Sequence, residues 1–213
     1  MTDPAPDADA PTDRPARRVS AKGERRRRQI IERAIELVAE RGIDGASLRS
    51  LAEEIGVSHT ALRHYFDSRD ALLIEVYREH ETRDDDARGD ELRTGVVDAM
   101  SATADRNRSV PGLVQLYATL TTDALQEQHP ATRAFVRDRF TDLRDDIAGR
   151  IERAKARGEV DPDIDAADAA ALLIAASDGL QVQWLLSPGT VDVRRSLDLL
   201  RRLLPDGDDP RRA

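Results

Sequence analysis

Residues 42–73 read GIDGASLRSLAEEIGVSHTALRHYFDSRDALL. Ser47 stands just before a run of apolar residues at helical spacing, which predicts a short helix with a serine cap. Gly56 ends that helix, and Ser58 caps a second one that runs to about Phe66. Two short helices joined by a glycine-containing turn predict a helix-turn-helix, whose second helix enters the major groove of DNA.

The spacing within the second helix separates core positions from surface positions. Leu62 is predicted to face inward and to pack against Val57, which precedes the cap. The positive N-terminal end of the helix faces the phosphates, and its outward positions are His59, Thr60, Arg63 and His64. Hydroxyls and cations at helix ends commonly contact the DNA backbone, and here they are Ser47, Ser58, Tyr65 and Arg69.

The charge of the chain is divided unevenly. Residues 17–63 contain eleven basic and seven acidic residues, so this segment carries +4. Because the whole chain carries −8, the remainder carries −12. A basic head on an acidic body is typical of a DNA reader, since the local field attracts phosphate and the body limits non-specific association.

Apolar residues recur at helical spacing through most of the remaining chain. A first helix is predicted over about residues 20–41, and Ser68 caps a helix that buries Leu72, Leu73, Val76 and Tyr77. No segment alternates apolar and polar residues as a strand does, so the predicted fold is all-α. Beyond residue 84 we predict helices over residues 91–107, 113–128, 131–157, 166–186 and 193–204.

Composition restricts the function further. The chain has no cysteine, which excludes thiolate nucleophiles and cysteine zinc sites and fits a reducing compartment. Residues 1–18 are rich in proline and poor in large apolar side chains, so they are predicted to be a disordered tail and not a signal peptide. We expect a cytoplasmic protein without a membrane span. Motifs for catalysis, a cofactor or a metal are not found, so neither an enzyme nor a cofactor is expected.

The sequence resembles the TetR family of transcriptional regulators over about residues 21–76. The resemblance rests on ERG at 40–42, SLRSLA at 47–52, IGVS at 55–58 and HYFDSRDALL at 64–73. Two positions depart from the family pattern: Thr60 stands where members often have Gly or Pro, and Arg63 where they often have Tyr. Arg63 therefore has two open roles, reading a guanine edge or binding a phosphate.

The resemblance implies a ligand-responsive repressor that binds a palindromic operator as a homodimer and is released by a small-molecule effector. It implies these domains: a tail at 1–18, the helix-turn-helix domain at 19–66, a helical ligand-binding and dimerisation domain at 67–205, and a tail at 206–213. It places the DNA contacts on Ser47, Arg49, Ser58, His59, Thr60, Ala61, Arg63, His64, Tyr65 and Arg69.

The resemblance also covers the larger domain, more weakly. Residues 169–186 are rich in small side chains, and the last two helices with their symmetry mates are expected to form the four-helix bundle of the dimer. Residues 178–184 with Asp192 resemble the C-terminal domain of BetI-type regulators. An effector pocket is mostly apolar with a few polar groups, and the candidates for its wall are Tyr77, Gln115, Tyr117, Thr121, Phe140 and Trp184. For each of these, simple core packing or surface exposure is the alternative.

Other functions remain open at this point. A constitutive architectural DNA-binding protein without an effector predicts a body filled with side chains. A helical enzyme requires paired catalytic groups in a cleft, which the sequence does not show. Arg25–Arg28 is either an arm along the DNA backbone or a solvated helix start.

Overall fold

The computed structural model describes residues 21–43, 47–87 and 95–202, and within these ranges it contains helices and no strand. The helices are α1 (Ala21–Arg41), α2 (Leu48–Ile55), α3 (His59–Tyr65), α4 (Arg69–Ala87), α5 (Val96–Asn107), α6 (Pro111–Asp123), α7 (Pro130–Ala156), α8 (Ala166–Leu186), α9 (Val193–Leu197) and the 3-10 turn η2 (Asp198–Arg202). The all-α prediction is confirmed. The predicted tails, 1–18 and 206–213, lie outside the described residues.

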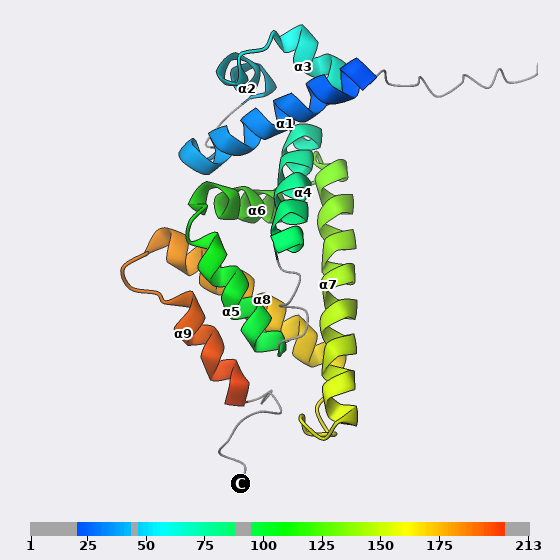
Figure 1. Ribbon diagram of the computed structural model, residues 1–213, viewed down its shortest axis with the longest axis vertical. Coiled ribbons are helices and arrows are strands. Elements are labelled where there is room, and N and C mark those ends of the chain that lie inside the picture. The colour runs from blue at the N-terminus through cyan, green and yellow to red at the C-terminus, as the bar shows by residue number, and fades with distance from the viewer. Residues whose placement is uncertain (1–20, 44–46, 88–94, 203–213) are drawn as a thin grey trace, which may run out of the picture.

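The helices form a small head and a larger body (Figure 1). Helices α1, α2 and α3 gather at one end of the molecule, and α4 leads from this head into the body formed by α5–α9. The long helix α7 runs beside α4 and packs along α8. The head and the body are therefore joined by α4, and also by α6, which contacts α1.

Serine caps start the three helices of the sequence motif, as predicted. The Oγ atoms of Ser47, Ser58 and Ser68 each accept a backbone N–H three residues later, at 3.1, 3.1 and 3.0 Å. Gly56 ends α2 at a φ of 79°, a left-handed conformation that favours glycine. Each serine cap contributes about 1 kcal/mol to the stability of its helix.

One apolar cluster joins the head to the body. It includes Leu51 and Leu62 of the helix-turn-helix, Leu72 of α4, and Leu116 and Leu120 of α6, all almost completely buried. This core crosses the predicted domain boundary between residues 66 and 67. Because close-packed residues move together, a shift of α4 or α6 within the body changes the packing of the helices of the head.

Helix α6 sits directly on the end of α1. A Cβ atom added to Gly112 would lie only 1.9 Å from the carbonyl oxygen of Val38. Glycine is required here because the two backbones approach too closely for any side chain. The approach fixes the first turn of α6 against the last turn of α1.

Three of the predicted helices have different boundaries in the structure. The helix predicted over 91–107 begins at Val96, with Gly95 as its N-cap. The helix predicted over 113–128 begins at Pro111, because proline is well suited to the first helical position, and ends at Asp123. The chain then turns, and the carbonyl of Ala124 accepts a hydrogen bond from Arg133 of α7 at 3.0 Å. The helix predicted over 193–204 is α-helical only to Leu197 and then narrows to the 3-10 turn η2.

Candidate DNA-binding surface and ligand cavity

Helix α3 is anchored by one face and exposes the other. Leu62, in the middle of α3, is completely buried, and Tyr65 at the end of the helix is half-buried. The side chains expected to face the groove are on the outside: His59, Thr60, Arg63 and His64 are exposed, and Ala61 is half-buried. The structure therefore brings these predicted base readers together on one short helix.

The predicted backbone contacts of α2 lie beside them. Ser47 is exposed, although its hydroxyl oxygen already accepts the cap hydrogen bond, and Ser58 has the same arrangement at the start of α3. Arg49 is exposed and lies 3.4 Å from Glu53 one turn later. An exposed pair of this kind is weak, so it leaves the Arg49 guanidinium available to DNA.

Arg69 is placed differently from the other predicted contacts. Its side chain is only 25% exposed, and its guanidinium lies 3.9 Å from Asp70 and 3.8 Å from Asp123 at the end of α6. These two carboxylates compete with a phosphate for the same cation. The structure thus gives Arg69 a role in attaching α4 to α6, whether or not it also contacts DNA.

The basic run at the start of α1 is divided. Arg25, Arg26 and Arg28 are exposed on the surface of the helix. Arg27 instead lies 2.7 Å from Glu75 of α4 and 5.1 Å from the centre of the Phe66 ring. Three of the four arginines are therefore exposed to solvent, and the fourth joins α1 to α4.

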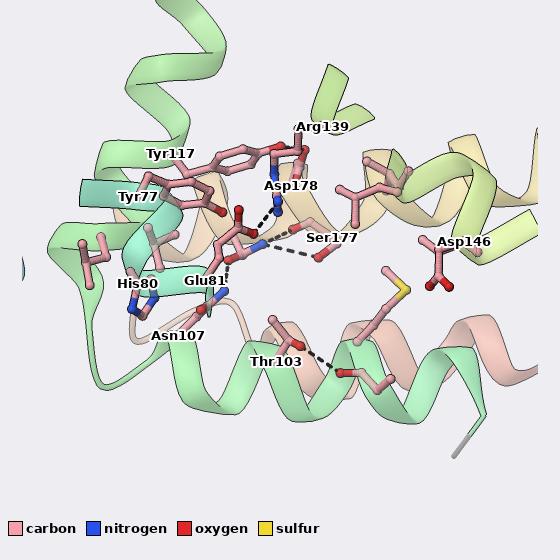
Figure 2. Close-up of a pocket in the computed structure, with 18 of the residues that line it drawn as sticks. Tyr77, His80, Glu81, Thr103, Asn107, Tyr117, Arg139, Asp146, Ser177 and Asp178 are labelled. Atoms are coloured by element: carbon pink, nitrogen blue, oxygen red, sulfur yellow. Dashed lines mark hydrogen bonds and ion pairs between the residues drawn. The ribbon is translucent and has the colours of Figure 1, made fainter. Parts of the chain in front are cut away.

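A cavity of about 320 Å³ lies in the body between α4, α5, α6, α7 and α8 (Figure 2). The apolar residues of its wall include Val96, Met100, Leu143, Ile147 and Ile174. Aromatic, amide and charged groups also line it. Several of them gather around Arg139 and Asp178, which we call the polar side, whereas Asp146 lies apart from them (Figure 2). A cavity with both kinds of surface suits a small amphipathic molecule.

Two tyrosines and an arginine form a stack at the polar side of the cavity. The rings of Tyr77 and Tyr117 are nearly parallel, at 19°, with centroids 5.1 Å apart. The Arg139 guanidinium carbon lies 5.2 and 5.0 Å from these two centroids, and the guanidinium forms an ion pair with Glu81. Figure 2 shows this group beside Asp178. The stack fixes the position of a buried cation in the wall.

Asp178 is a second carboxyl beside this stack (Figure 2). The Tyr117 hydroxyl donates a hydrogen bond to it at 3.3 Å. Burial raises the pKa of Asp178 to about 6, against the opposing effects of the Arg139 charge and the Tyr117 hydrogen bond. Burial also raises the pKa of the Tyr77 and Tyr117 hydroxyls, so both remain protonated donors at neutral pH.

Amide groups complete the polar side. The Asn107 side-chain amide donates to Gln181 at 2.5 Å, which joins α5 to α8. The Gln181 amide in turn lies 3.3 Å from the Ser177 hydroxyl. The side chains of Asn107, Gln181 and Ser177 therefore have hydrogen-bond partners within the wall itself.

The six residues predicted for the effector pocket separate into two groups. Tyr77 and Tyr117 line the cavity. The other four do not: Gln115 lies against Gly42 of α1, and Thr121 donates to the Tyr117 carbonyl at 3.0 Å. Phe140 packs between two apolar clusters, and Trp184 packs against α5 and α9.

Sequence reasoning missed several polar residues of the wall. Arg139, Glu81 and Asp178 were not among the predicted residues, because charged side chains within amphipathic helices normally lie in solvent. A signal existed for Asp178, which interrupts the otherwise apolar run of residues 169–186. A single carboxylate in such a run either faces a partner or lines a polar cavity.

Two family models match the chain. The model described as bacterial regulatory proteins of the tetR family matches residues 30–76, and that of the BetI-type transcriptional repressor C-terminal domain matches residues 90–207. The second match alone covers more than half of the chain. The chain belongs to the TetR family.

Several relatives match over most of their length. The transcriptional regulator TtgR of Pseudomonas putida is 28% identical over 208 residues, which cover 87% of this chain and 96% of TtgR. Among solved structures, a TetR-family regulator from Rhodococcus sp. has a TM-score of 0.68 at 24% identity and covers 84% of this chain and 97% of its own. A regulator from Saccharomonospora viridis, solved in complex with choline, has a TM-score of 0.67 at 24% identity, with 84% and 96% covered.

Membership settles the general function. TetR-family proteins are transcriptional regulators that bind DNA and small-molecule effectors, and they are not a family of enzymes. The expectation of a ligand-responsive transcriptional repressor with a helix-turn-helix and a BetI-type C-terminal domain is confirmed.

Proposed function

We propose that this TetR-family repressor binds a palindromic operator as a homodimer through α3, and that an effector bound in the cavity releases it. One observation supports the proposal above the others. The cavity is walled by α4 and α6, the same two helices that share a core with the helix-turn-helix. A ligand that displaces either helix therefore alters the position of α3.

The predicted base readers are His59, Thr60 and Arg63 on α3, with Arg49 on α2. Because α3 is only seven residues long, one copy contacts a few base pairs, too few for a specific site. Dimeric helix-turn-helix proteins solve this with two half-sites about 34–36 Å apart or a multiple of that distance. A two-fold dimer requires an inverted repeat in the DNA.

The proposed dimer interface is the outer face of α8 with α9. Apolar side chains are exposed there: Leu172 is 54%, Val182 43% and Leu186 79% exposed. Helix α8 is also long and apolar enough, by composition, to cross a membrane. We assign the exposed apolar face to a second copy of a cytoplasmic protein, because contiguous apolar patches on soluble proteins mark interaction surfaces.

The cavity also bears on the alternative of a constitutive architectural DNA-binding protein. That alternative predicts a body filled with side chains, whereas the body contains a cavity of about 320 Å³. Interiors that serve only stability are close-packed and have few voids larger than a water molecule. The cavity therefore favours control by a ligand.

Choline, which the Saccharomonospora viridis regulator binds in its structure, is one compound to consider. The Asp178 carboxyl would attract its positive charge. The aromatic faces that hold a quaternary ammonium in other proteins are, however, already covered here by the Arg139 guanidinium. The electrostatics of this wall thus do not single out choline.

A cavity-filling variant tests the proposal. Ala99 lines the cavity from α5, and Ala99→Phe would occupy its space. We expect this variant to repress a reporter gene in bacteria as the wild type does, but to lose release by any inducing compound found in a metabolite screen. Ala131→Phe, at an exposed position of α7, is the matched control and should still be released. Equal release of A99F and wild type would contradict the assigned effector site.

A further inference from the structure

The charges of the cavity wall do not balance. Among the described residues that line it, Glu81 forms an ion pair with Arg139, and Asp146 lies 4.0 Å from Arg150. Asp178 is the third carboxyl of this set, and it has no ion pair in the described part of the chain. With histidine counted as neutral, the described wall therefore carries one net negative charge, which belongs to Asp178.

Asp178 is an acceptor that its surroundings compensate incompletely. Its hydrogen bond from the Tyr117 hydroxyl is long, at 3.3 Å. Burial raises the pKa of its carboxyl to about 6, because the Arg139 charge and the Tyr117 hydrogen bond do not offset the loss of solvent. The carboxyl is thus ionised at pH 7.5, and a cation that binds beside it would stabilise its charge.

A ligand in the cavity reaches this carboxylate. Asp178 lines the cavity and is partly exposed, and Figure 2 shows it at the polar side. The Ser177 hydroxyl, one residue earlier on α8, also lines the cavity. A primary ammonium has three N–H donors and can therefore bind the carboxylate and the hydroxyl together, whereas a quaternary ammonium has no donor.

We propose that the effector is a cation that donates hydrogen bonds, such as a primary amine or an amidine, on an apolar body. Its charge pairs with Asp178, while Met100, Leu143 and Ile147 contact the body. Burying an ion costs several kcal/mol unless it gains a partner of its own, and Asp178 is that partner. This inference rests on the proposed function, since it names the ligand class of the same cavity.

Other head groups fit the wall less well. A carboxylate would meet two carboxyls, Glu81 and Asp178, and only one arginine, which Glu81 already pairs. A neutral amide donates a hydrogen bond but brings no charge to balance Asp178. A quaternary ammonium brings the charge but no donor. The two tyrosine rings that would hold it are already covered by the Arg139 guanidinium.

Four probes with the same eight-carbon chain test the head group: octylammonium, octyltrimethylammonium, octanamide and octanoate. Their binding to the full chain is measured by isothermal titration calorimetry at pH 7.5. We expect octylammonium to bind about tenfold more tightly than each of the others, because a hydrogen bond between two charged groups contributes at least that factor. Equal or tighter binding of any other probe, or no binding of octylammonium at millimolar concentration, would overturn the inference.

A variant assigns the preference to Asp178. Asp178→Asn keeps the size and one acceptor oxygen but removes the charge, so the preference for octylammonium over octanamide should fall to about twofold or less. Asp142→Asn, on the exposed face of α7, is the control and should keep the wild-type preference. If D178N weakens both probes equally, the preference does not come from the Asp178 charge and the inference is wrong.

A second variant locates the bound probe. Ala99→Phe occupies the cavity and should abolish octylammonium binding, whereas Ala131→Phe should leave it unchanged. Undiminished binding in A99F would place the probe outside the cavity, on an exposed apolar surface, and would contradict the assignment.

Operator release separates this inference from the proposed function. If another probe binds most tightly and releases the operator, the head-group inference is wrong and the cavity remains the effector site. If octylammonium binds with the expected preference and operator affinity does not change, the head-group assignment stands and effector control through this cavity is wrong.

Discussion

The Nδ1 atom of His129, just before α7, lies 2.6 Å from a carboxylate oxygen of Asp70 in the first turn of α4. Beside this contact, Arg69 lies 3.8 Å from Asp123 at the end of α6. Both contacts attach the start of α4, which follows α3 directly, to helices that line the cavity. The orientation of α3 is therefore held by side chains of the body.

Replacing the histidine should loosen this attachment. His129→Ala removes a hydrogen bond to a mostly buried carboxylate, and we expect a loss of about 1–2 kcal/mol in the free energy of unfolding. Operator affinity should fall by up to about tenfold, because α3 is no longer held in one orientation. Urea unfolding and fluorescence anisotropy with labelled operator measure the two effects.

Glu127→Ala, at an exposed position of the same turn, is the control. Unchanged operator affinity in H129A would contradict the positioning role.

The two arginines of the motif should behave differently. Arg63→Ala should cost about 1–3 kcal/mol per half-site and relax the preference at one base pair, since Arg63 is exposed on the face of α3 that we propose meets the groove. Arg69→Ala should weaken binding to all sequences about equally, because its guanidinium is held by Asp70 and Asp123 and not by a base.

Binding to a panel of single-base operator variants measures both changes. Arg144→Ala, on the exposed surface of α7, is the matched control and should not affect DNA binding. A uniform loss of affinity in R63A would make Arg63 a phosphate contact.

The buried carboxyl of the cavity should produce a pH-dependent stability difference. The pKa of Asp178 is raised to about 6 in the folded chain, so the folded state binds this proton more tightly than the unfolded state does. Stability from this group is thus present at low pH and is lost as the pH rises from about 4 to about 6.

Asp178→Asn removes that loss. The variant should be more stable than the wild type by about 1–2 kcal/mol at pH 8, and the difference should shrink toward pH 4. Urea unfolding at pH 5 and pH 8 measures it, with Asp142→Asn as an exposed control. A difference that grows as the pH falls would have the wrong sign for a carboxyl destabilised by burial.

The contact of α6 with α1 should tolerate no side chain. In Gly112→Ala the new Cβ would lie 1.9 Å from the Val38 carbonyl oxygen, and backbone atoms cannot move aside cheaply. We expect a loss of about 3 kcal/mol or more in the free energy of unfolding. Gly189→Ala is the control, because a Cβ there meets no atom within 4 Å. A wild-type stability for G112A would show that α6 is not seated on α1 as described.

Local features of the fold were predictable from the sequence because they depend on neighbouring residues. The serine caps at Ser47, Ser58 and Ser68 follow from side chains that accept hydrogen bonds three residues away. The exposed face of α3 follows from helical periodicity once Leu62 is placed in the core. The all-α class follows from the same periodicity along the chain.

The cavity was predictable only in part, because its wall depends on how helices far apart in sequence meet. Tyr77 was placed on a buried helix face by periodicity, and it does line the cavity. Periodicity does not give the rotation of one helix against another, so Gln115 of α6 faces α1 instead of the cavity. Arg139 was missed because only the two stacked tyrosines and Glu81 make a buried guanidinium favourable there.

The most direct test of the central claim is selection of bound DNA from a random duplex pool by the full chain, followed by sequencing. The account predicts enrichment of one inverted repeat whose half-site centres are one helical turn of DNA, about 34–36 Å, or a multiple of it apart. Selection of a single unrepeated motif, or no enrichment over the starting pool, would contradict a dimeric operator-binding repressor.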